Sequence, residues 1–207
     1  MVGQRSVFEV IATSDLVGLA GVLFEPGRLP AFVNERADLF SNQSVPLDQV
    51  WPDDIDSLRN RMLEGSCPQA RLCILEQFLC GVLVKRASAR ACHPAVEFAL
   101  REIGRKSNGL SIAELARQTG WSERRLSQIF REQVGFPPKV WTRLQRFQSA
   151  VRQLRAGVDV RWADVAQQCG FYDQAHLANE FRAFSGMDAT TYTASFHRLW
   201  ANHTRTE

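Results

Sequence analysis

Two stretches of this sequence repeat one pattern: SIAELARQTGWSERRLSQIFREQVGFPP at residues 111–138 and RWADVAQQCGFYDQAHLANEFRAFSGMDA at residues 161–189. Each predicts a short helix, a turn that contains glycine, and then a longer helix. An alanine stands four residues before the glycine of each turn: Ala116 before Gly120, and Ala166 before Gly170. A small side chain there lets two helices cross closely, and glycine adopts the positive φ that ends a helix. The repeat therefore predicts two helix-turn-helix units.

The second helix of each unit is predicted to have a polar face opposite its apolar one. Ser122 and Asp173 are of the residue types that cap the start of a helix. The residues expected to face outward are Arg124, Ser127, Gln128 and Arg131 in the first unit, and Gln174, His176 and Asn179 in the second. In a major groove, Arg forks onto guanine, and Gln and Asn pair with adenine. An ordinary solvated helix face is the alternative, but two polar faces repeated at one period favour DNA binding.

The tract WADVAQQCGFYDQAHLANEFRAFSGMDATTY resembles the signature of the AraC/XylS transcription regulators. The resemblance covers about residues 93–200, because both units and the connecting segment PPKVWTRLQRFQSAVRQLRAG match. It implies a mainly α protein whose DNA-binding domain holds about seven helices, including two helix-turn-helix units joined by a long helix. The expected bounds are 94–201 for the domain, 111–134 and 161–184 for the two units, and 138–155 for the connecting helix.

The same resemblance implies which residues meet DNA. Base-reading positions are Arg124, Ser127 and Gln128 in the first unit, and Gln174, Ala175, His176 and Asn179 in the second. Candidates for phosphate contacts are Ser122, Arg131, Arg143 and Arg146. Ala175 offers no hydrogen bond, so the second unit is expected to be the less demanding reader. The family's usual proline after the last glycine is absent, and Asp188 is expected to cap the final helix instead.

Residues 1–86 are predicted to be part of an N-terminal sensory or dimerisation region, followed by a linker at 87–93. LAGVLFEPGRLPAFVNERADLFSNQSVPLDQVW resembles the end of such a domain in one AraC subgroup. Two apolar stretches within residues 5–24 predict a pair of strands, and helices are expected over 48–64 and 68–84. The resemblance implies a domain that begins with several more strands, so this small α+β segment looks truncated. Because a two-stranded ribbon is only marginally stable, the alternative is that its strands pair with something else, such as a second subunit.

The helix expected at 68–84 is apolar on nearly every side, and this leaves two interpretations open. Its stripe of Leu72, Leu75, Leu79 and Val82 is either core against the preceding helix or the seam of a homodimer. Cys73 and Cys80 are expected to be small buried hydrophobes, with a redox sensor as the minor alternative.

Composition excludes several classes of protein. The 207 residues contain no apolar run long enough to span a membrane, and the N-terminus lacks a secretory signal pattern. Five cysteines without C-x-x-C spacing argue against a disulfide scaffold or a zinc site. Residues 1–92 carry 9 basic and 11 acidic side chains, whereas residues 93–207 carry 16 and 11. We expect a cytoplasmic protein, located at the bacterial nucleoid, whose back half is basic.

Enzyme activity is not expected. The four histidines do not cluster with acidic or cysteine residues at metal-ligand spacing, and neither a nucleophile elbow nor a Walker loop is present. We therefore predict no catalytic residue, no metal and no cofactor. Double-stranded DNA is the expected partner, RNA polymerase is a further candidate, and a small-molecule effector stays unknown. The rival interpretation is a helical protein-interaction module without specific DNA binding. A redox-responsive regulator is a weaker rival.

Overall fold

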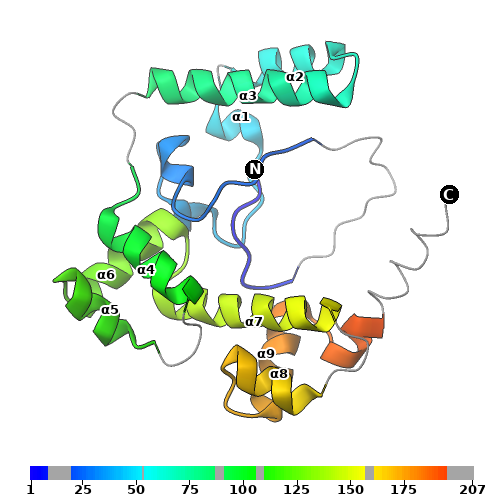
Figure 1. The fold of residues 1–207 in the computed structure, drawn as a ribbon. Helices are drawn as coiled ribbons and strands as arrows, with labels where there is room; N and C mark the ends of the chain where they lie inside the picture. The colour runs from blue at the N-terminus through cyan, green and yellow to red at the C-terminus, as the bar shows by residue number, and fades with distance from the viewer. Residues whose placement is uncertain (9–19, 53, 87–90, 106–109, 157–160, 195–207) are drawn as a thin grey trace. The chain divides into compact units, whose positions relative to one another are not determined.

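The computed structural model consists of helices joined by turns and short loops (Figure 1). It describes residues 1–8, 20–52, 54–86, 91–105, 110–156 and 161–194. The α-helices are α1 (Leu47–Val50), α2 (Ile55–Glu64), α3 (Pro68–Lys85), α4 (Pro94–Arg105), α5 (Ile112–Thr119), α6 (Glu123–Val134), α7 (Pro138–Ala156), α8 (Trp162–Cys169) and α9 (Gln174–Ser185). Two 3₁₀-helices, η1 (Leu29–Ala31) and η2 (Ala37–Phe40), precede them. The predicted mainly α fold is confirmed.

The strand pair expected within residues 5–24 does not appear in the described part of that stretch, which comprises residues 5–8 and 20–24. The remaining positions, 9–19, lie outside the described residues. The first residues of the chain pair elsewhere, through an antiparallel bridge between Val2 and Ser44. Two backbone hydrogen bonds flank this bridge, from Gly3 N–H to Gln43 C=O and from Val45 N–H to Met1 C=O.

The single helix expected at 48–64 is wrong, because the structure has two shorter helices there. α1 ends at Val50 and α2 begins at Ile55. Pro52 explains the break, since proline has no N–H to donate and disfavours helical backbone in the residue before it. Trp51 accordingly leaves the helix with φ −133° and ψ 72°.

The described residues group into two compact units. The first contains those within 1–5, 20–98 and 124–137, and the second those within 6–8, 99–123 and 138–194. α6 belongs almost wholly to the first unit and α8 and α9 to the second. The division into a front region, a linker and a back domain stays a prediction, and linker residues 87–90 lie outside the described part.

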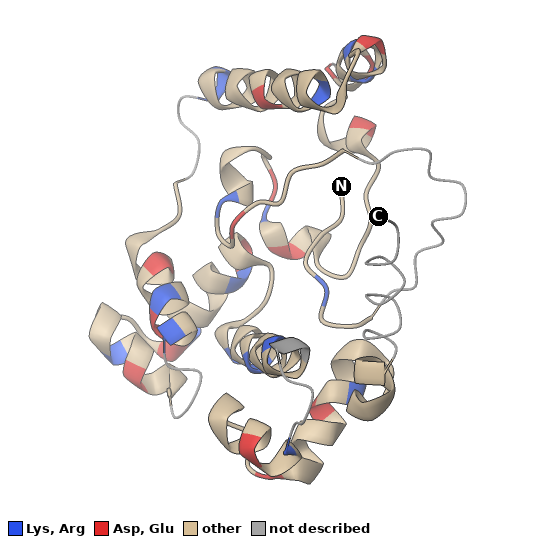
Figure 2. Ribbon diagram, turned by 45° about the vertical axis from the view of Figure 1, so that its right-hand side comes forward, with Lys and Arg blue, Asp and Glu red and all other residues tan. Residues whose placement is uncertain are grey.

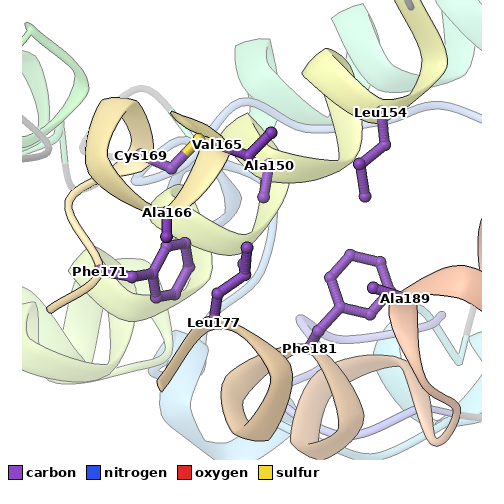
Figure 3. Packing of buried hydrophobic residues seen from close by; sticks show 9 residues of the cluster. All are labelled: Ala150, Leu154, Val165, Ala166, Cys169, Phe171, Leu177, Phe181 and Ala189. Atoms are coloured by element: carbon purple, nitrogen blue, oxygen red, sulfur yellow. The ribbon is translucent and has the colours of Figure 1, made fainter. Parts of the chain in front are cut away.

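The second unit has an apolar core formed by α7, α8 and α9. Figure 3 shows Leu177 and Phe181 of α9 pointing toward residues of α7 and α8. The buried cluster consists of Ala150, Leu154, Val165, Ala166, Cys169, Phe171, Leu177, Phe181 and Ala189. Phe147 adds two ring contacts, with centroids 5.0 Å from Phe181 and 5.2 Å from Phe184. This core fixes how α9 lies against the connecting helix.

In the first unit, α3 packs along α2 (Figure 1). Leu79 and Val82 are buried, and Trp51 meets Phe78 edge-on at 5.4 Å, so part of the apolar surface of α3 is core. The rest is exposed, with Leu72, Leu83 and Val84 exposed by 45%, 39% and 78%. α3 therefore buries only one side within the described residues.

Burial of Cys73 and Cys80 was predicted wrongly, because both thiols lie on the exposed side of α3. Cys67 is also exposed, whereas Cys92 and Cys169 are buried. Burial raises the pKa of the Cys92 and Cys169 thiols, since desolvation disfavours the thiolate. The described residues contain no helix long and apolar enough to span a bilayer.

Candidate nucleic-acid interface

The two glycine turns of the repeat have the same backbone geometry. Gly120 ends α5 with φ +71°, and Gly170 ends α8 with φ +78°, which confirms the predicted left-handed conformations. The residue after each glycine donates its backbone N–H to the alanine four residues before that glycine. The distances are 3.0 Å from Trp121 to Ala116 and 2.8 Å from Phe171 to Ala166. This is the hydrogen-bond pattern that satisfies the last carbonyls of a helix.

The start of α9 is fixed by two side chains. Asp173 caps it as predicted, with Oδ1 accepting from the backbone N–H of His176 at 2.7 Å. The His176 ring returns toward the turn, where Nδ1 accepts the backbone N–H of Tyr172 at 3.2 Å. Phe171 holds the same ring edge-on at 5.5 Å. Because Nδ1 accepts, the neutral ring carries its proton on Nε2, which is the nitrogen left to donate to a ligand.

The other predicted readers of α9 lie on its exposed side. Gln174, Ala175 and Asn179 are exposed, whereas Leu177 is buried as the helical spacing predicts. Gln174 and Ala175 occupy the first turn, and Asn179 follows one turn after Ala175. α9 therefore presents amide side chains and one methyl group, without a charged residue among its predicted readers.

α6 has the predicted division into two faces. Leu126 and Phe130 are fully buried, while Arg124 and Gln128 are exposed and Ser127 is half-buried. The Gln128 amide donates from Nε2 to Oε1 of Glu132 at 3.1 Å. This bond directs the amide nitrogen toward the next turn of the helix and uses one of its two hydrogens, so the second hydrogen and the accepting amide oxygen are not engaged by it.

The four phosphate candidates have different surroundings. Ser122 is exposed and Arg146 is half-buried. Arg143 donates from Nε and Nη2 to the two carboxylate oxygens of Glu180 at 2.8 and 2.7 Å, which joins α7 to α9. These hydrogen bonds raise the pKa of the Arg143 guanidinium. Arg131 forms an ion pair with Asp38 of η2, with 3.3 Å between Nε and Oδ2.

Known proteins match the part of the chain that holds these features. The helix-turn-helix domain family matches residues 115–195, which extend from α5 past the end of α9. Residues 115–195 match this family, and they are the part of the chain that resembles the AraC-type regulators. The transcriptional activator AarP of Providencia stuartii is 28% identical over 92 residues, which is 44% of this chain and 67% of the relative.

Two solved structures are also similar to the AraC-type part of the chain. The DNA-binding domain of AdpA, crystallised with a target DNA, is 27% identical with a TM-score of 0.47, covering 51% of this chain and 94% of that one. A probable AraC family regulator from Rhodopseudomonas palustris is 24% identical with a TM-score of 0.45, covering 50% and 97%. The name of the Providencia stuartii relative, a transcriptional activator, agrees with the expected transcription regulator rather than with an enzyme.

Sequence reasoning missed two features next to the AraC-type readers. Tyr172, directly before the cap of α9, is 92% exposed. Its position beside a predicted N-cap was a signal that could have identified it. Arg36 and Asp38 lie against α6 although each precedes its partner, Glu132 or Arg131, by more than ninety residues, and no local pattern relates the two segments. Acidic and basic side chains are interspersed along the helices (Figure 2), so charge alone marks neither feature.

Proposed function

We propose that the chain binds specific sequences of double-stranded DNA and regulates transcription through the AraC-type domain. One observation carries the proposal: the two units have the same turn geometry, and in each the second helix begins with exposed polar side chains. Side chains at the start of such a helix reach base edges when the helix lies in a major groove. The name of the Providencia stuartii relative, a transcriptional activator, supports the same role.

The proposed base contacts come from both helices, α6 and α9. Arg124 donates in a fork to guanine O6 and N7, and the Gln128 oxygen accepts from an exocyclic amine. On α9, Gln174 and Asn179 pair with adenine, and His176 donates from Nε2 to a base acceptor. Ser127 and Ala175 complete the two faces, and Ala175 contacts a thymine methyl. Ser122, Arg131 and Arg146 contact phosphates, which adds affinity without sequence choice.

The two helices are proposed to enter successive major grooves on one side of the duplex. Such grooves recur every ~34 Å, or one helical turn. The binding site would then consist of two short sequence blocks about ten base pairs apart.

Selection of bound sequences from a random DNA pool by the full chain, at about 0.15 M salt, tests the proposal. Two enriched blocks one turn apart support it. The double variant Gln174→Ala/Asn179→Ala should lose one block and keep the other, whereas Arg117→Ala, an exposed arginine on α5 paired with Glu114, should keep both. Absence of any enriched sequence, with weak binding lost at moderate salt, would favour a protein-interaction module instead.

We further propose that the exposed side of α3 joins two copies of the chain. Leu72, Leu83 and Val84 supply apolar area there that the fold leaves in contact with solvent. Burial of such side chains stabilises association, because it removes apolar surface from water. Sedimentation of the full chain and of Leu83→Glu/Val84→Glu tests this, since the variant should sediment as the lighter species. A monomeric wild-type chain would exclude it.

RNA polymerase is the proposed protein partner of the DNA-bound chain, at the bacterial nucleoid. Co-precipitation on the selected operator, with and without the chain, tests this. A small-molecule effector would be detected as a ligand-dependent shift in operator affinity.

A further inference from the structure

A short segment from the front half docks on the predicted DNA-reading helix α6. Ser41, directly after η2, donates its hydroxyl to the backbone carbonyl of Gly135 at 2.7 Å. Gly135 has φ +103°, and a Cβ there would approach Ser41 Oγ to 3.0 Å and Ala37 C=O to 3.5 Å. The close approach shows that residues 36–41 pack against the C-terminal end of α6.

The contact also contains four charged groups. Asp38 accepts from Arg36 through both carboxylate oxygens, at 2.9 Å from Nε to Oδ1 and 2.6 Å from Nη2 to Oδ2. The same Oδ2 also lies 3.3 Å from Nε of Arg131. Arg36 also reaches Glu132, with 3.6 Å between Nη1 and Oε1. The side chain of Asp38 is only 14% exposed, while that of Arg131 is 48% exposed. A shielded carboxylate is thus held against a guanidinium that solvent reaches.

Arg131 lies on the same face of α6 as the predicted base readers. It follows Arg124 by seven residues and Ser127 by four, and both spacings return to one side of an α-helix. A carboxylate beside Arg131 therefore stands at one end of the proposed DNA-contacting face. DNA phosphates are anions of the same sign and take the same bidentate donors as carboxylates.

We propose that Asp38 competes with a DNA phosphate for the guanidinium of Arg131, so that segment 36–41 lowers the affinity of α6 for DNA. The inference rests on the proposed function, because it requires α6 to contact DNA. Asp38 belongs to the part of the chain before the AraC-type match at 115–195. The front half therefore regulates the reading helix through a direct contact.

The hydrogen bonds between Arg36 and Asp38 allow Arg131 to exchange Asp38 for a DNA phosphate and back again. When Arg131 turns to a phosphate, Asp38 keeps both hydrogen bonds to Arg36, so no unpaired carboxylate is left in a shielded position. An unpaired buried charge would oppose the exchange strongly. Because Arg131 is nearly half exposed, water screens its pair with Asp38, and the masking effect is expected to be moderate.

Equilibrium binding of the full chain to its selected operator tests the mask, which is the pairing of Asp38 with Arg131 that keeps this arginine from a DNA phosphate. Asp38→Asn removes the charge but keeps the side-chain shape, and Glu35→Gln removes the same charge from an exposed neighbour three residues earlier. We expect Asp38→Asn to bind about two- to fivefold more tightly than wild type, the range of a partly exposed ion pair. Glu35→Gln should change affinity by less than about 1.5-fold, because screened charges act weakly. The gain from Asp38→Asn should vanish in an Arg131→Ala background.

A second variant reaches the same contact without changing charge. Ser41→Ala deletes the hydroxyl that anchors the segment to Gly135, so it should tighten binding in the same direction but by less. This variant decides the question if Asp38→Asn proves poorly folded. Affinities for Asp38→Asn and Ser41→Ala no higher than for Glu35→Gln would overturn the mask.

Failure of the mask differs from failure of the proposed function. If wild type binds the operator and the variants bind equally well, only the mask is wrong. If wild type selects no DNA sequence, the proposed function is wrong and the mask falls with it. A gain that persists in the Arg131→Ala background would show that Asp38 acts by another route, which also overturns the inference.

Discussion

α6 and α9 share one backbone plan but have different side-chain chemistry and different neighbours. α6 exposes Arg124 and Arg131, and its far end is held by charged residues of segment 36–41. α9 exposes Gln174, Ala175 and Asn179. Its opposite side packs through apolar contacts on α7 and α8, and the Arg143–Glu180 pair also joins it to α7. The turn sets the direction of a helix, whereas its neighbours decide which side chains are available to a ligand. Affinity is therefore expected to come mainly from α6.

The apolar support of α9 gives the largest expected effect. Phe181 is fully buried, so Phe181→Ala removes a large side chain from the core and should lower the free energy of unfolding by about 3–5 kcal/mol. Chemical denaturation of both proteins measures this. Tyr172→Ala, at an exposed aromatic nearby, is the control and should stay within about 0.5 kcal/mol of wild type. A small loss for Phe181→Ala would mean that α9 is not held by this core.

The contrast between the two readers predicts that an α6 variant loses more affinity than an α9 variant. Arg124→Ala should cost about 1–3 kcal/mol of binding free energy on the selected operator, because it removes a bidentate contact to guanine. The variant should also discriminate less strongly among bases at the one base pair that Arg124 contacts. Competition binding against single-base operator variants measures both effects. An equal loss of affinity on every sequence would mean that Arg124 contacts a phosphate and not a base. A larger loss of affinity for Asn179→Ala than for Arg124→Ala would mean that α9 contributes more than α6.

Arg143 distinguishes a structural arginine from a DNA-binding one. Arg143→Ala deprives the mostly shielded Glu180 of its two donors, so we expect a loss of about 1–2 kcal/mol in unfolding free energy. In the double variant Arg143→Ala/Glu180→Ala, part of that loss should be recovered, which thermal or urea unfolding of the three proteins would show. Unchanged stability together with a weaker salt dependence of DNA binding would instead support the phosphate contact predicted from sequence.

The smallest expected effect concerns the helical residues 189–194, which follow α9. Asp188 accepts the Thr191 hydroxyl at 2.6 Å and the Thr191 backbone N–H at 2.8 Å, and these bonds lower the pKa of its carboxyl group. A pKa lowered by folding stabilises the protein above the unfolded value of ~3.9, and this stability is lost as pH falls through the folded value.

Urea unfolding midpoints at several pH values between 7 and 3 would measure this contribution. Asp188→Asn should be less stable than wild type at neutral pH, and the difference should shrink below about pH 4. Asp56→Asn, an exposed carboxylate on α2, is the control and should show no such convergence. A difference that stays constant with pH would mean that the carboxylate charge at position 188 does not act as the cap.

Sequence patterns predicted the back half of the chain closely, for local reasons. Glycine at the ends of α5 and α8 and Asp173 at the start of α9 act on backbone groups a few residues away. The front half followed its patterns less well. Pro52 divides the helix expected at 48–64, and α3 leaves Cys73 and Cys80 exposed because only one of its sides packs on α2.

Local sequence patterns also predicted the candidate interface only in part. Polar residues at helical spacing identified the outward faces of α6 and α9, since that spacing depends only on helix geometry. The partners of those residues come from distant segments, such as Glu180 for Arg143 and Asp38 for Arg131. A local pattern cannot anticipate such pairs.

The sequence by itself determined the repeated helix-turn-helix plan, the caps and turns that delimit it, and the residue types on its polar faces. These features depend on neighbours within about one or two turns of helix. Only the tertiary structure decided which arginines are engaged and by what. Ion pairs between distant segments form when packing brings their charges within a few ångströms, and the apolar contacts that do so depend on the whole folded unit.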